Sequence, residues 1–206
     1  MKPILFNTEM VKAILEGRKT QTRRVVKGSA LGGLMMKKAS KDILKEYAPY
    51  KVNDILYVRE TWTDHYVPNE FGRPEMQYCY RADGIDIKAE CLPGESNRWY
   101  PSIHMPKEAA RIFLKITNIK IERLQDMRLE DFKAEGIAAS SISPDDDLNY
   151  RFEFINIWDS TLKKDQISHY EWEANPYVWV IEFEVLPCSS ITEAEKLEVQ
   201  YEKNVL

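Results

Sequence analysis

Residues 17–24, Gly-Arg-Lys-Thr-Gln-Thr-Arg-Arg, carry four cationic side chains and two threonine hydroxyls. Cations spaced this closely in a globular chain are solvated, paired with acids, or directed at an anion such as a phosphate. A solvated turn is the simplest interpretation, because charge runs usually form solvated surfaces. Thr20 and Thr22, which are interleaved with the cations, favour contact with phosphate, ribose or a base edge. We call residues 17–24 the basic segment.

The elements that position the basic segment begin with a predicted helix directly before it. Asn7 or Thr8 is suited to cap this helix, and Gly17 stands where a left-handed C-terminal cap would close it. Its apolar residues fall on one face: Met10, Val11, Ile14 and Leu15. The sequence therefore predicts that the basic segment is presented at a defined helix end.

Alternating apolar residues predict strands in the rest of the chain, with short helices between them. Strands are expected over residues 3–6, 54–62, 76–81, 111–124 and 178–185, and a further strand is expected to begin at Val25-Val26. Helices are expected over residues 40–47 and 129–135, and after a cap at Asp147. This pattern indicates an α+β fold built on a small, partly open barrel decorated with helices.

We expect a single domain over residues 1–187, with insertions near 28–50 and 63–100 that contain Gly, Pro and charged residues. Residues 188–206 form a tail in which the capping box that starts at Thr192 predicts a short helix. A total of 206 residues, with 44% hydrophobic content, is sufficient for one packed core.

The net charge of −4 argues against a protein that coats nucleic acid through a broad basic surface. Any contact with nucleic acid is therefore expected in a local cleft. The three cysteines, Cys79, Cys91 and Cys188, form no Cys-x-x-Cys pair, so we predict neither a disulfide framework nor a metal site, and we expect no cofactor. No apolar run reaches membrane-spanning length, and no signal peptide is evident at the N-terminus, so we expect a cytoplasmic protein.

Four separated stretches resemble the ASCH domain, a relative of the PUA-like RNA-binding domains, and in particular its longer phage and prophage members. The first is the helix followed by Gly-x-Lys-Thr-x-Thr-x-Arg at 17–24. The others are Asp-Ile-Leu-Tyr-Val-Arg-Glu-Thr-Trp at 54–62, Pro-Ser-Ile-His-Met-Pro at 101–106 and Asn-Pro-Tyr-Val-Trp-Val-Ile-Glu-Phe at 175–183. The resemblance implies a PUA-like barrel whose ligand cleft lies beside the basic segment.

In some compact members, the resemblance implies removal of an acyl group from N4-acylated cytidine. Carried over, the catalytic residues would be Lys19, Thr22 and Glu135, with Glu60 as the alternative carboxylate. A lysine whose pKa is lowered by burial and by neighbouring arginines would accept the proton of Thr22, which then attacks the acyl carbon. Because Lys19 and Thr22 point to opposite sides of a strand, this scheme requires the basic segment to be turn-like.

A binding module would hold RNA, a nucleotide or a modified nucleoside without catalysis. This function does not require a nucleophile and a base in a fixed geometry, so we favour it over the amidohydrolase. The candidate ligand-binding residues are Thr20, Arg23, Arg24, Arg59, Trp62, Ser102 and His104. The arginines would hold phosphate and Trp62 would stack a base. A ribonuclease that uses His104 and Lys19 ranks below both, because no spacing in the sequence selects it.

Overall fold

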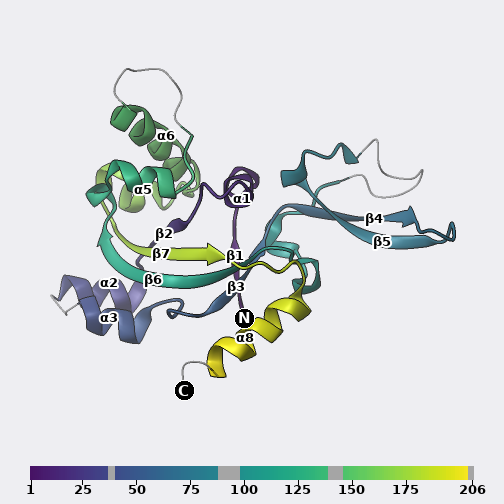
Figure 1. The fold of residues 1–206 in the computed structure, drawn as a ribbon. Helices are drawn as coiled ribbons and strands as arrows, with labels where there is room; N and C mark the ends of the chain where they lie inside the picture. The colour runs from purple at the N-terminus through teal and green to yellow at the C-terminus, as the bar shows by residue number, and fades with distance from the viewer. Residues whose placement is uncertain (37–39, 88–97, 139–145, 204–206) are drawn as a thin grey trace. The chain divides into compact units, whose positions relative to one another are not determined.

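The structure, a computed structural model, describes residues 1–36, 40–87, 98–138 and 146–203 (Figure 1). The chain forms two compact units, and each unit is assembled from segments that are distant in the sequence. Unit 1 comprises Met1–Leu15, Ile55–Leu114 and Val185–Leu206, and unit 2 comprises Glu16–Asp54 and Lys115–Glu184.

Unit 1 begins with β1 (Lys2–Leu5), which pairs in parallel with β3 (Ile55–Arg59). Helix α1 (Thr8–Leu15) follows β1 and buries one apolar face. Asn7 caps this helix, because its Oδ1 accepts a hydrogen bond of 2.8 Å from the backbone N–H of Met10. The predicted strand, cap and helix of the N-terminal region are thus all present.

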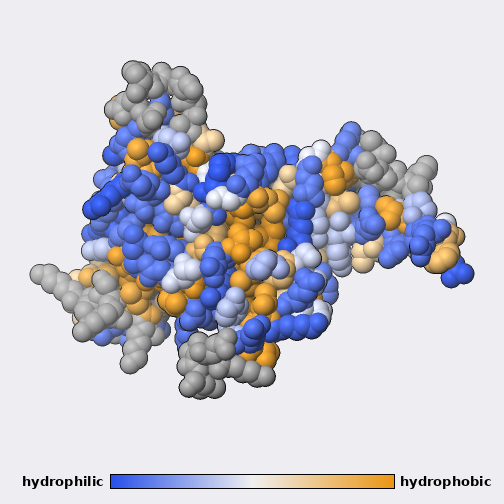
Figure 2. All heavy atoms as spheres, in the orientation of Figure 1, coloured by the Kyte–Doolittle hydropathy of each residue, from blue (hydrophilic) through white to orange (hydrophobic). Residues whose placement is uncertain are grey.

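The remaining elements of unit 1 are a hairpin, short helical turns and a C-terminal helix (Figure 1). Strands β4 (Trp62–Pro68) and β5 (Pro74–Tyr80) pair with each other in a two-stranded antiparallel sheet. The 3₁₀ turns are η1 (Arg81–Asp83), η2 (Ser102–His104) and η3 (Lys107–Ala109). Helix α8 (Ile191–Lys203) packs Ala194 into a core cluster that contains Met105 and Phe113. The hairpin exposes scattered apolar residues among hydrophilic ones, as Figure 2 shows.

The sheet of unit 2 is formed by β6 (Phe113–Arg123), which enters from unit 1, by β7 (Tyr177–Val185) and by β2 (Gln21–Val25). Their order is β6-β7-β2, and β2 runs antiparallel to β7 with Thr22 opposite Ile181. The apolar residues of β7 that predict a strand from the sequence are buried, so this sheet forms the centre of unit 2.

Helices surround this sheet, and their apolar faces form the core of unit 2. They are α2 (Gly28–Met35), α3 (Ser40–Tyr47), α5 (Leu129–Ala134), α6 (Asp146–Ser160), α7 (Ile167–Tyr170), and the 3₁₀ turns η4 (Leu124–Asp126) and η5 (Trp172–Ala174). Phe132 of α5, Phe154 and Trp158 of α6, and Trp172 share one cluster with Val178 and Val180 of β7. Helices α5 and α6 therefore pack on each other beside the sheet (Figure 1).

The α+β class expected from the sequence is confirmed. The described strands of each unit form open sheets with two edges, and no closed barrel is present within either unit. The basic segment also differs from expectation, because Gln21 to Arg24 belong to strand β2 rather than to a turn. Cys79 and Cys188 are free thiols, whereas Cys91 lies outside the described residues. No described helix is both long and apolar enough to cross a membrane.

Candidate functional site

The basic segment is held in an extended conformation between α5 and β7. Gly17 has a φ of 72°, a left-handed value that favours glycine, and redirects the chain after α1. The backbone N–H of Thr20 donates to the carbonyl of Ala134 at 2.8 Å, and the Thr20 carbonyl accepts from Phe183 at 2.9 Å. Side chains in an extended segment alternate between its two faces. The residues of the basic segment are therefore divided between two environments.

Lys19 points into the interior of unit 2 against the end of α5. Its side chain is 1% exposed, and its Nζ lies 2.7 Å from Oε2 and 2.9 Å from the backbone carbonyl oxygen of Glu135. Glu135 itself ends α5, where the helix dipole disfavours an anion. The Lys19 ammonium compensates for that unfavourable position.

Arg23 lies on the same face as Lys19 and contacts three carboxylates. Its Nη1 is 3.0 Å from Glu135, and its Nη2 is 2.7 Å from Glu122 and 3.1 Å from Asp131. Gln21, between them on this face, donates to Oδ1 of Asp131 at 3.1 Å. We call the residues Lys19, Gln21, Arg23, Glu122, Asp131 and Glu135 the buried ionic cluster. Arg23 was expected to bind ligand, but it is 3% exposed and paired within this cluster.

Burial and neighbouring charges set the protonation of the buried ionic cluster. Burial lowers the pKa of Lys19 below its ordinary value; the Glu135 carboxylate opposes this effect, and Arg24 and Arg23 add to it. Burial also acts to lower the pKa of Arg23, but Glu135 and Glu122 outweigh it and raise the pKa. Lys19 is thus the member of the cluster whose neutral form is favoured relative to an exposed side chain.

Thr22 and Arg24 occupy the alternate positions of β2, on the face opposite Lys19 and Arg23. Thr22 is 2% exposed. Arg24 is partly buried. Burial lowers its pKa below the ordinary value, and the charges of Glu135 and Tyr50 oppose this shift. Because the segment is extended, the condition under which Lys19 would activate Thr22 is not met. The predicted catalytic lysine and glutamate are therefore brought together, whereas the predicted nucleophile lies on the other face.

A hollow lies on the outer side of the segment that carries Lys19. It is lined by Gly17, Arg18, Thr20, Glu130, Lys133, Ala134, Ile137 and Tyr150, and it has a volume of about 550 Å³. We call it the basic hollow. Arg18 donates through Nε to Glu16 at 2.7 Å, and Lys133 lies over the Tyr150 ring at 5.5 Å from its centroid. Two cations, a hydroxyl, a carboxylate and an aromatic ring thus converge on one concave surface of unit 2.

Glu60, the alternative catalytic carboxylate, belongs to unit 1 and has a different partner. It is 1% exposed, and its Oε1 lies 3.0 Å from Nε of Arg111, which also contacts Asp83 at 2.8 Å. Burial raises the pKa of Glu60, and the hydrogen bond and charge of Arg111 oppose this shift. Glu60 is thus a buried carboxylate whose counterion is Arg111.

The other predicted ligand-binding residues also lie in unit 1, and two of them contact neighbouring residues of that unit. Arg59 donates through Nε to the backbone carbonyl of Met105 at 2.8 Å. Trp62 is half-buried and packs against the rings of Tyr78 and Tyr100, with centroids at 5.8 and 5.2 Å. Ser102 and His104 lie on the short turn η2, where His104 is exposed. Of the predicted ligand-binding residues, Thr20 is therefore the one that lines the basic hollow.

Comparison with known proteins adds little to this geometry. No family model matches the chain, and no curated protein matches it. Among solved structures, the chain is similar to the crystal structure of protein EF3133 from Enterococcus faecalis V583, described under the family model DUF984. The identity is 12% and the TM-score is 0.38, over 90% of this chain and 70% of that one. A likeness of this size establishes neither a shared fold nor a shared activity.

Sequence reasoning missed Arg18, Lys133 and Tyr150 as members of the site. Arg18 is within the basic segment, and strand alternation would have separated it from Lys19 had the segment been recognised as extended. Lys133 and Tyr150 lie on α5 and α6, where helical spacing marks Tyr150 as a core residue. No local signal links these two residues to a segment more than 100 positions away.

Proposed function

We propose that this chain is an ASCH-domain protein with a PUA-like fold, and that the basic hollow binds RNA, a nucleotide or a modified nucleoside. The observation that carries the proposal is the convergence of Arg18, Lys133, Thr20 and Tyr150 on one concave surface. A volume of about 550 Å³ falls within the range of roughly 300–1,000 Å³ that is typical of small-ligand sites.

Each lining group matches a part of a nucleotide. Arg18 and Lys133 would pair with phosphate oxygens, for which exposed cations are the usual protein donors. Tyr150 offers a ring on which a base would stack, as single-stranded RNA commonly does on aromatic side chains. The Glu130 carboxylate accepts hydrogen bonds and would receive one from an exocyclic amino group or a ribose hydroxyl. The hollow therefore suits a base with its sugar and phosphate better than a bare anion.

The buried ionic cluster supports the hollow in this proposal without touching the ligand. Lys19 and Glu135 form an isolated antiparallel bridge between their backbones, and their neighbours Arg18, Thr20 and Ala134 line the hollow. The cluster thus fixes the distance between the basic segment and α5, which are the two walls of the site.

Fluorescence anisotropy with a labelled single-stranded RNA tests the proposal. We expect Lys133→Gln to weaken binding several-fold, and Tyr150→Ala to weaken it by about tenfold or more, the usual loss for one stacked base. Tyr150→Phe, which keeps the ring, serves as the matched control and should bind as the wild type does. Wild-type protein without affinity for RNA or mononucleotides, or a Tyr150→Ala variant with unchanged affinity, would refute the proposal.

Hydrolysis of N4-acylated cytidine is the second candidate, and the burial of Lys19 beside Glu135 is the observation in its favour. A lysine with a lowered pKa is suited to accept a proton, and the carboxylate would orient it. With Thr22 on the opposite face of β2, the nucleophile in this scheme would be water. Incubation with N4-acetylcytidine should then release cytidine in the wild type and in Thr22→Ala, but not in Lys19→Met.

Ribonuclease activity has the least support. The proposed acid and base, His104 and Lys19, belong to different units of the chain.

A further inference from the structure

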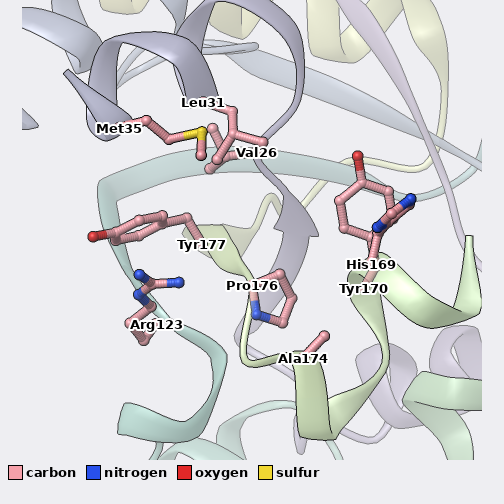
Figure 3. Close-up of a pocket in the computed structure, with 9 residues that line it drawn as sticks. All are labelled: Val26, Leu31, Met35, Arg123, His169, Tyr170, Ala174, Pro176 and Tyr177. Atoms are coloured by element: carbon pink, nitrogen blue, oxygen red, sulfur yellow. The ribbon is translucent and has the colours of Figure 1, made fainter.

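A second pocket of unit 2 combines aromatic rings with cations and does not contain residues of the basic hollow (Figure 3). It is lined by Val26, Leu31, Met35, Arg123, His169, Tyr170, Ala174, Pro176 and Tyr177. We call it the aromatic pocket. In Figure 3, Tyr177 and Arg123 lie on one side, Tyr170 and His169 lie on the other, and Pro176 is between them.

The aromatic pocket is bounded by an anchored backbone. Asn175 adopts a left-handed φ of 43°, and its carbonyl accepts a hydrogen bond of 2.9 Å from Nη1 of Arg123. The carbonyl of Tyr177 accepts from Val26 at 2.9 Å, and that of Tyr170 accepts from Nε1 of Trp158 at 2.7 Å. These hydrogen bonds fix the backbone from which both tyrosine rings extend. Such preorganisation lowers the entropy cost of binding.

Two cations flank the aromatic pocket at fixed positions. The Arg123 guanidinium lies 3.8 Å from the centroid of the Tyr177 ring, and the Lys27 ammonium lies 4.9 Å from that of Tyr170. Both cations are on exposed side chains. Among the described residues that line the pocket, none is acidic. The charge of this site therefore complements an anion.

The interior of the aromatic pocket is apolar and small. Leu31 and Met35 extend from α2 toward Val26 at one wall. The volume of about 180 Å³ is below the range of roughly 300–1,000 Å³ for sites that enclose a whole drug-sized ligand. Flat walls and a small volume suit a single planar ring system, with any charged substituent outside the pocket.

We propose that the aromatic pocket binds the base of a nucleotide, whose phosphate is held by Arg123 and Lys27. The ring stacks against the tyrosines, and His169 at the rim offers a ring nitrogen for a hydrogen bond to the base edge. Free nucleotides and the nucleotides of a single-stranded RNA share this chemistry. The proposal does not depend on the basic hollow, because the two sites have no lining residue in common.

Isothermal titration of the full chain with adenosine 5′-monophosphate tests the aromatic pocket. Ala174→Trp introduces a ring at the edge of the pocket and should abolish the binding. Arg123→Gln should weaken binding of the monophosphate by about tenfold more than it weakens binding of adenosine, the usual loss for one charge-assisted hydrogen bond to phosphate. Arg73→Gln, an exposed arginine of unit 1, serves as the matched control for Arg123.

The variants of the two sites separate the two proposals. Lys133→Gln alters the basic hollow and should leave the Ala174-sensitive binding intact. Comparison with a short oligoadenylate identifies the source of the ligand, because a strand that binds more tightly than the monophosphate indicates RNA and equal affinity indicates the free nucleotide. Failure to bind either compound up to about 5 mM, or binding that Ala174→Trp does not change, would overturn the proposal.

Discussion

The Nζ of Lys19 lies 2.7 Å from Oε2 of Glu135, and both side chains are closed off from solvent. This contact joins the basic segment to the end of α5 across 116 positions of the sequence. The cations of the basic segment therefore fall into two groups, which face different surroundings. Lys19 and Arg23 face inward and neutralise carboxylates, whereas Arg18 faces the basic hollow. The positive charge available to a ligand is therefore smaller than the sequence indicates.

Substitutions within the buried ionic cluster should have coupled effects on the free energy of unfolding. We expect Glu135→Gln to lower the free energy of unfolding by about 3–5 kcal/mol, because it leaves the Lys19 ammonium buried without its counterion. Lys19→Met should cost less, because Arg23 still pairs with Glu135. The double variant should lose less than the sum of the two by about 1–3 kcal/mol. Urea unfolding of the four proteins measures this coupling. Strictly additive losses would show that the two side chains do not interact in the folded protein.

Glu16 competes with a ligand for Arg18 in the basic hollow. Its carboxylate accepts from Nε of Arg18 at 2.7 Å, and both side chains are exposed. Since an exposed ion pair contributes at most about 1 kcal/mol, Glu16→Gln should tighten RNA binding about two- to fivefold. Glu9→Gln, which removes the exposed partner of Lys12 on α1, is the matched control. Weaker binding by Glu16→Gln in anisotropy titrations would contradict a role of Arg18 in the site.

The raised pKa of the Tyr80 hydroxyl should make the folded state of unit 1 less stable in strong alkali. Burial raises the pKa of Tyr80 from 10.0 to about 12, and its hydroxyl donates to the carbonyl of Ala109 at 2.7 Å. The unfolded chain then loses this proton at lower pH than the folded chain, so stability falls as the pH rises from about 10 to about 12. The decline should be at most about 2 kcal/mol, because Tyr80 is partly solvent-accessible.

Tyr80→Phe isolates this effect from the other groups that titrate in alkali. The difference in unfolding free energy between wild type and Tyr80→Phe should shrink between these pH values, whereas Tyr66→Phe, at an exposed tyrosine, should show no such trend. A wild-type-minus-variant difference that stays constant with pH would mean that the Tyr80 hydroxyl does not keep its proton preferentially in the folded state.

Much of the fold follows from local patterns in the sequence. The alternating residues of β7 and the cap at Asn7 predict a strand and a helix at their observed positions. Strand β2 was not predicted, because Gln21 to Arg24 are polar throughout and show no alternation of apolar and polar residues. Arg23 is buried because Glu122, Asp131 and Glu135 neutralise it from distant positions. Long-range ionic pairing of this kind leaves no periodic signal near the basic segment.

The sequence predicted only part of the candidate site, because long-range contacts again leave no local signal. The pairing of Lys19 with Glu135 was expected from the resemblance, and the structure brings these side chains together. Arg23 was predicted to hold phosphate, and in the structure its guanidinium is paired with three carboxylates. The wall formed by Lys133 and Tyr150 depends on the packing of α5 on α6, which spacing along the sequence does not specify.

The salt dependence of RNA binding tests the central claim most directly, namely that Arg18 and Lys133 contact phosphate while Lys19 and Arg23 do not. Two phosphate contacts on a single strand predict a slope of about −1.4 in a plot of log binding constant against log salt concentration, at about −0.7 per contact. Arg18→Gln and Lys133→Gln should each reduce the magnitude of the slope by about 0.7, and together they should bring it close to zero. A slope that the double variant leaves unchanged would contradict the account, because the phosphate contacts would then lie elsewhere on the chain.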